Sequence, residues 1–153
     1  MSKSLRKRSK KTFEKGIDKL SDWVHKKGYS IEFDYCVRDE FHPADKTITI
    51  SLRQGPEKRL YSLMHECGHL ILHHNEKLYA KKYPSSTKMA YYNSNHRLER
   101  SPKYKIDILS EEIDAWRKGQ DLAKRLNFYI DEENYYSIMA ICVYSYVKSL
   151  AKP

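Results

Sequence analysis

The sequence has little of what marks secreted or membrane proteins. It contains only three cysteines, Cys36, Cys67 and Cys142. An odd number without paired spacing does not fit a disulfide framework and favours a reducing compartment. No apolar run approaches the roughly 18 residues that a membrane span needs, and the basic N-terminus lacks the apolar stretch of a secretory signal. These absences predict a cytoplasmic protein that does not enter a membrane.

Positive charge is abundant, and it is concentrated in two segments. The net charge is +9, and residues 1–11 carry six Lys or Arg and no acid, whereas residues 75–105 carry eight and two acids. We expect a disordered basic tail at 1–11 and one domain over 12–153, with a long, tyrosine-rich connection at 75–105. Both segments are candidates for contact with nucleic acid. For residues 75–105 we favour a lid that covers a substrate. Contact with nucleic acid is the second alternative, and a plain surface loop is the third.

Hydrophobic periodicity predicts an α+β fold. Apolar residues recur at helical spacing over 12–26, 57–74, 106–127 and 134–150. Apolar and polar residues alternate over 29–37 and 47–52, which indicates two half-buried strands. We expect these strands to pair as an antiparallel hairpin. The predicted order is an N-terminal helix, a small antiparallel sheet and three further helices.

The second predicted helix contains the pattern H-E-x-x-H, formed by His65, Glu66 and His69. Histidines four residues apart project from adjacent turns of one helix face and can share a zinc ion. Glu66 can reach a water beside that ion without being a ligand, so we expect it to be the general base. The alternative is a surface helix, but the flanking residues are apolar, and burying these side chains without a metal would be costly. Cys67 should point into the core, and Gly68 should allow close helix packing.

A third protein ligand is needed for a tetrahedral site. The longer pattern H-E-x-x-H-x-x-G-x-x-H fails because its last position is Asn75. On the helix predicted at 106–127, Glu112 lies at the centre of the apolar stripe, whereas Glu111 and Asp114 lie away from it. Gly119 shares that stripe and would allow another helix to approach. We therefore predict Glu112 as the third ligand, and the alternative is a buried Glu112 paired with Lys or Arg.

At these residues the chain resembles the gluzincins, in which H-E-x-x-H is followed by a glutamate motif, here Glu112-x-x-Ala115. The segment Arg59–His73 is similar to the small ImmA/IrrE-type metallopeptidases of bacteria, phages and mobile elements, and the resemblance covers about residues 12–130. It implies a zinc metallopeptidase acting on a protein or peptide, in some members a transcriptional repressor. His65, His69 and Glu112 would be its ligands and Glu66 its general base. Trp116 stands where the family usually has Asn or Asp.

Two other functions stay open at this point. One is a DNA-associated regulator that keeps zinc only for structure. The other is a protease of DNA-bound proteins, similar to the SprT-like enzymes, with His96 as the third ligand. Hydrolysis also needs a donor to the oxyanion of the tetrahedral intermediate. The sequence does not choose among its four candidates, Tyr91, Tyr92, His96 and Tyr144.

Overall fold

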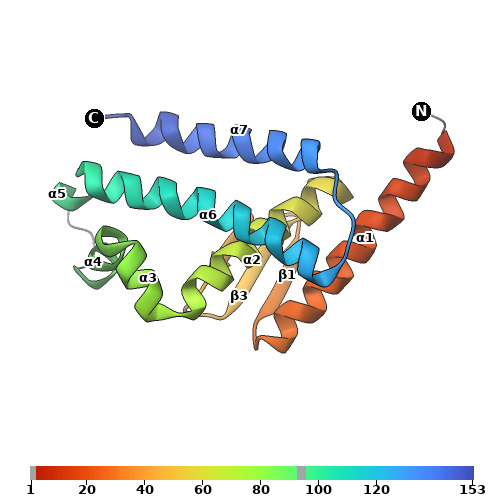
Figure 1. The fold of residues 1–153 in the computed structure, drawn as a ribbon, viewed down its shortest axis with the longest axis horizontal. Coiled ribbons are helices and arrows are strands. Elements are labelled where there is room, and N and C mark those ends of the chain that lie inside the picture. The colour runs from red at the N-terminus through yellow and green to blue at the C-terminus, as the bar shows by residue number, and fades with distance from the viewer. Residues whose placement is uncertain (1–2, 93–95) are drawn as a thin grey trace.

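The computed structural model describes residues 3–92 and 96–153, with the side chains of 10–90 and 96–153 (Figure 1). The first half of the chain contains α1 (Lys3–Lys26), β1 (Ser30–Asp34), β2 (Glu40–His42), β3 (Thr47–Ser51) and α2 (Pro56–His74). The second half contains α3 (Glu76–Lys82), α4 (Pro84–Tyr92), α5 (His96–Glu99), α6 (Pro102–Leu126) and α7 (Glu132–Leu150). Helices dominate and one small sheet is present, so the α+β prediction is confirmed.

The sheet is mixed, and the predicted antiparallel pairing of its two longer strands is wrong. Its strand order is β1-β3-β2. β1 pairs with β3 in parallel, whereas β2 pairs with β3 antiparallel. The short strand β2 precedes the turn at 43–46 and folds back as the antiparallel neighbour of β3. β1 is therefore left to pair with the opposite edge of β3.

Helix α1 covers the sheet and α2 with one apolar face. Phe13, Ile17, Leu20 and Val24 recur at helical spacing, and all four are buried in the core. The helix begins at Lys3 and so includes most of the segment predicted to be a disordered tail. Lys and Arg are good helix formers, which lets the helix extend toward the N-terminus from Phe13. In Figure 1 this N-terminal part projects away from the other elements.

The close crossing of α2 and α6 is the feature that positions the site. A Cβ at Gly68 on α2 would lie 1.9 Å from the backbone oxygen of Ala115 on α6. A Cβ at Gly119 on α6 would lie 2.4 Å from the backbone oxygen of Met64 on α2. The two helix backbones therefore touch at both points, as predicted for these glycines. This contact brings the middle of α6 directly over the middle of α2.

The connection between α2 and α6 is largely helical. Residues 75–105, expected to lack a regular pattern, include α3, α4 and α5. Asn75 caps α3 by accepting a hydrogen bond from the backbone N–H of Leu78. Helix α7 then runs back along α6 (Figure 1). In the part of the chain that the structure describes, no helix combines the length and apolar character that crossing a membrane requires.

Candidate metal centre

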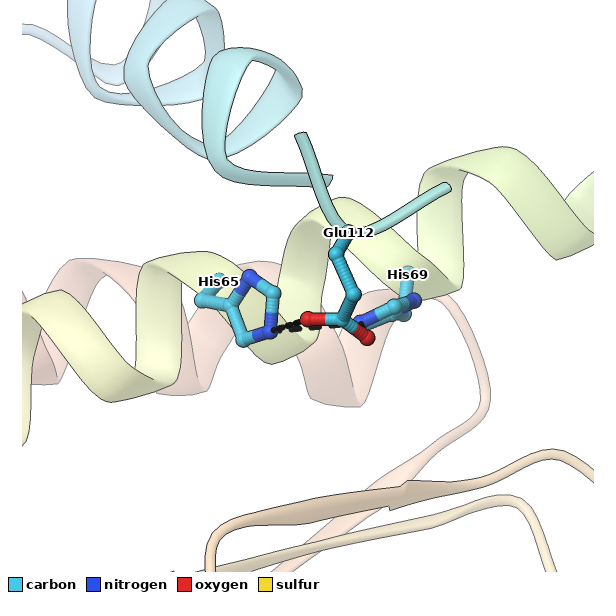
Figure 2. A group of neighbouring side chains, drawn as sticks. All are labelled: His65, His69 and Glu112. Carbon is cyan, nitrogen blue, oxygen red and sulfur yellow. Dashed lines mark hydrogen bonds and ion pairs between the residues drawn. The ribbon is translucent and has the colours of Figure 1, made fainter. Parts of the chain in front are cut away.

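The two histidines of the H-E-x-x-H pattern face the same side of α2. Their Nε2 atoms are 3.2 Å apart, as expected for side chains on adjacent turns. Figure 2 shows both rings lying beneath the segment of α6 that carries Glu112. His69 is buried, and the side chain of His65 is only 12% exposed. The site is therefore formed inside the protein, at the floor of a cleft.

Glu112 completes a group of three convergent donors. Its Oε2 lies 3.1 Å from His65 Nε2, and its Oε1 lies 3.2 Å from His69 Nε2. With metal–ligand bonds of about 2.0–2.1 Å, a tetrahedral zinc ion separates neighbouring donor atoms by roughly 3.3 Å. The observed separations match that requirement, so these three residues are placed to hold a metal ion. Two imidazoles and one carboxylate are also a donor set that zinc prefers.

Glu66 lies beside this group without belonging to it. Its Oε1 is 3.9 Å from His65 Nε2, farther than the carboxylate of Glu112. The residue is buried, and burial raises the pKa of its carboxyl to about 8. A carboxyl whose pKa lies near neutrality can both take up and release a proton. Glu66 is thus placed to exchange a proton beside the three donors.

Mutual interactions shift the acidity of the three donors. Burial alone would raise the pKa of Glu112, but hydrogen bonds to His65 and His69 bring it below its ordinary value. Burial alone would lower the pKa of His69, but hydrogen bonds to Glu111 and Glu112 raise it. For His65, burial prevails and the pKa falls. In the absence of metal, a proton on His69 therefore balances the carboxylates.

Several residues around the donors were not expected from the sequence. Glu111, predicted to lie away from the site, accepts a hydrogen bond at 2.8 Å from Nδ1 of His69. Tyr79 of α3 donates a hydrogen bond to the same carboxylate. Trp116 stacks on His65, with ring centroids 4.4 Å apart and planes inclined by 21°. The sequence contained one indication of these contacts, the second glutamate directly before Glu112. The contacts from α3 were not predictable, because they depend on the tertiary fold.

His96 and Tyr144, two of the alternative candidates, lie away from the donors. His96 is on α5 with its side chain 86% exposed, and it pairs with Glu99. Tyr144 is 61% exposed, under the ammonium of Lys148. The side chains of Tyr91 and Tyr92 fall outside the described residues. Cys67 is buried in the core, as predicted, and burial raises the pKa of its thiol.

Two hollows of about 350 and 480 Å³ open on either side of the donors. The first runs toward α7 and is lined by Trp116, Ile138 and Cys142 among others. The second runs toward α4 and is lined by residues such as Phe41 and Met89. The hollows share five lining residues, which are Asp39, His65, Glu66, Glu112 and Tyr146. The donors therefore lie where the two halves of one groove meet, and an extended chain could cross them.

Comparison with known proteins agrees with this geometry. Residues 26–101 match the family model Peptidase_M78, described as the IrrE N-terminal-like domain. No curated protein and no solved structure matches the chain. The matched range includes the H-E-x-x-H helix and ends before Glu112, which the crossing of α2 and α6 brings to the histidines. The match over residues 26–101 therefore supports an IrrE-type family of metallopeptidases for this chain.

Proposed function

We propose that the protein is a zinc-dependent endopeptidase of the gluzincin type, with His65, His69 and Glu112 as the metal ligands and Glu66 as the general base. One observation carries this proposal. The Nε2 atoms of His65 and His69 lie 3.2 Å apart, each lies 3.1–3.2 Å from one oxygen of the Glu112 carboxylate, and a buried glutamate lies beside them. A bound zinc ion would lower the pKa of water and polarise the peptide carbonyl.

The chain's own residues divide the remaining work. Glu66 would accept a proton from the attacking water at its carboxylate and deliver it to the amide nitrogen as the C–N bond breaks. Trp116 holds the ring of His65 by stacking. The groove on both sides of Glu66 would bind the peptide and place its carbonyl over the donors. Its apolar lining near Trp116, Ile138 and Cys142 favours an apolar side chain next to the cleaved bond.

Removal of a single ligand tests the metal site. We expect Glu112→Ala to lose stoichiometric zinc, because the remaining two histidines leave the coordination incomplete. His96→Ala should keep zinc, because that side chain is exposed and paired with Glu99. Metal content per chain after dialysis, measured by atomic emission, distinguishes the variants. Zinc lost from His96→Ala and retained by Glu112→Ala would instead support the SprT-like alternative.

Tyr146 is our candidate for the oxyanion donor. Of the five lining residues that the two hollows share, it is the one that carries a hydroxyl group, which is a donor at neutral pH. Burial, first among several causes, raises the pKa of this hydroxyl, which keeps it protonated. We expect Tyr146→Phe to lower kcat/KM by about 10²-fold or more with little change in zinc content.

A phosphinic peptide, which resembles the tetrahedral intermediate, provides a second measurement for Tyr146. Its affinity should fall in Tyr146→Phe, whereas the affinity of a product peptide should not. Tyr144→Phe is the matched control, because Tyr144 is on the same helix but lines neither hollow and lies under Lys148. Equal losses in the two variants would remove Tyr146 from the mechanism.

The family supports a protein substrate, and a regulatory protein in the cytoplasm is the substrate we favour. Contact with nucleic acid through the basic N-terminal segment and residues 75–105 stays a prediction. So does the alternative of a DNA-associated regulator with structural zinc. That alternative requires that Glu66 be dispensable, and the Glu66 variant discussed below therefore decides between the two.

A further inference from the structure

Helix α6 presents a row of three carboxylates to the connection that precedes it. Asp107, Glu111 and Asp114 are spaced by four and three residues, so they share one helix face. Asp107 Oδ2 accepts hydrogen bonds from the backbone N–H groups of Ser85 and Ser86, at 2.6 and 3.2 Å. These two bonds hold the first turn of α4 against α6.

Asp114, at the other end of the row, also binds the connection. Its Oδ2 accepts a hydrogen bond from the hydroxyl of Tyr83 at 2.6 Å and pairs with Lys82 at 2.9 Å. Asp114 thus anchors the end of α3 to α6. Neither of these contacts involves a histidine of the metal centre.

Glu111, in the middle of the row, differs because it contacts both the connection and the metal centre. Its Oε2 lies 2.8 Å from Nδ1 of His69, and its Oε1 lies 3.6 Å from Nε2 of His73. The hydroxyl of Tyr79 on α3 donates a hydrogen bond to Oε1. The Glu111 side chain is only 14% exposed, so water competes weakly for these bonds.

We propose that Glu111 is a positioning residue for His69 and that Tyr79 makes α3 part of the metal centre; the proposal rests on the function proposed above. A hydrogen bond from Nδ1–H to a carboxylate leaves the lone pair of Nε2 free for a metal and makes the ring a stronger ligand. Nε2 of His69 is the nitrogen that faces His65 and Glu112. Tyr79 in turn fixes the orientation of the Glu111 carboxylate.

A second metal ion is the competing explanation, because His69, His73 and Glu111 also lie close enough together to hold one. That arrangement would need both ring nitrogens of His69 to be free of protons, since each would bind a cation. A single hydrogen-bonded proton on Nδ1 satisfies the 2.8 Å contact with Glu111 without that cost. The number of ions per chain separates the two explanations.

The test compares zinc dissociation constants, measured by competition with a chromophoric chelator, in matched variants. We expect Glu111→Ala to bind zinc about 10–100-fold more weakly, as found when hydrogen-bond partners of metal-binding histidines are removed. Tyr79→Phe should weaken binding less, and Glu111→Gln, which keeps an acceptor oxygen, should lie between wild type and Glu111→Ala. Asp114→Ala is the control. It removes a carboxylate from the same row and frees Tyr83 of the same connection, but neither contact of Asp114 involves a histidine of the metal centre. The zinc dissociation constant should therefore change less than twofold.

The proton on Nδ1 of His69 can be observed directly. A purely structural role of Glu111 would not change its exchange. In the zinc-loaded wild type, ¹⁵N–¹H spectra of the side chain should show a slowly exchanging proton on Nδ1, and Glu111→Ala should lose that protection. Equal weakening by Glu111→Ala and Asp114→Ala would mean that Glu111 only anchors the connection. Two ions per wild-type chain, with one lost in Glu111→Ala, would establish the second metal site instead.

The outcomes also separate this inference from the proposed function. A wild-type chain that binds no zinc overturns both. A wild-type chain that binds one ion and keeps its affinity in Glu111→Ala and Tyr79→Phe overturns the positioning role alone. If Glu111→Ala does not fold, Tyr79→Phe replaces it in the test, because that variant removes only a single hydroxyl group.

Discussion

Glu66→Gln is expected to abolish peptide hydrolysis while the zinc remains bound. Glutamine keeps the size of the side chain, but it cannot take a proton from water at neutral pH. General-base catalysis typically contributes 10²–10⁴-fold to the rate, so we expect kcat/KM to fall by at least 10²-fold. Glu66 lies outside the set of three close donors, and metal content should therefore not change.

The experiment measures cleavage of fluorescein-labelled casein by zinc-loaded protein, with metal content determined on the same samples. Glu57→Gln on the same helix is a suitable control, because Glu57 binds Tyr61 and Asn134 rather than the metal centre. Wild-type cleavage that persists in Glu66→Gln would rule out Glu66 as the base. A biological activity that survives in this variant would support the DNA-associated regulator with structural zinc.

Gly68→Ala is expected to destabilise the fold strongly, although alanine normally favours a helix over glycine by about 1 kcal/mol. The new Cβ would lie 1.9 Å from the backbone oxygen of Ala115. Because that atom is backbone, no side-chain rotation can relieve the clash, and α2 and α6 must separate. We expect the free energy of unfolding to fall by about 3 kcal/mol, the upper part of the usual range for an overpacked core.

Urea unfolding followed by circular dichroism measures this change. Gly55→Ala serves as the control, because Gly55 has an ordinary φ of −68° and a Cβ added there would meet nothing within 4 Å beyond its chain neighbours. Separation of the helices would also draw Glu112 away from the histidines, so Gly68→Ala should bind zinc more weakly as well. A Gly68→Ala protein as stable as Gly55→Ala would show that the crossing is looser than described.

Residues related by local periodicity were predictable. The spacing of His65 and His69 alone places two rings on one helix face, and the helical wheel of 106–127 alone marks Glu112 as buried. Gly68 and Gly119 were likewise identified as points of close approach. Each of these inferences needs only the geometry of a single helix and the cost of burying a polar group.

Other features depend on which elements become neighbours. The sequence suggested an antiparallel hairpin, but β2 has only three residues, too few for an alternating pattern to reveal it. Glu111 falls off the apolar stripe of α6, and it becomes part of the site only because α3 and the end of α2 pack on that flank. Tyr146 was passed over in favour of Tyr144, since both lie on one helix and only the packing of α7 determines which faces the groove.

The sequence by itself therefore determined the α+β class, the helix that carries the H-E-x-x-H pattern, and the buried glutamate most suited to join its two histidines. Only the tertiary structure decided that Nε2 of His65, Nε2 of His69 and the Glu112 carboxylate meet within 3.2 Å. It also decided that Glu111 contacts Nδ1 of His69 and that Tyr79 contacts Glu111. The reason is physical: periodicity records the face on which a side chain lies, whereas distances between helices are set by how closely their backbones can pack.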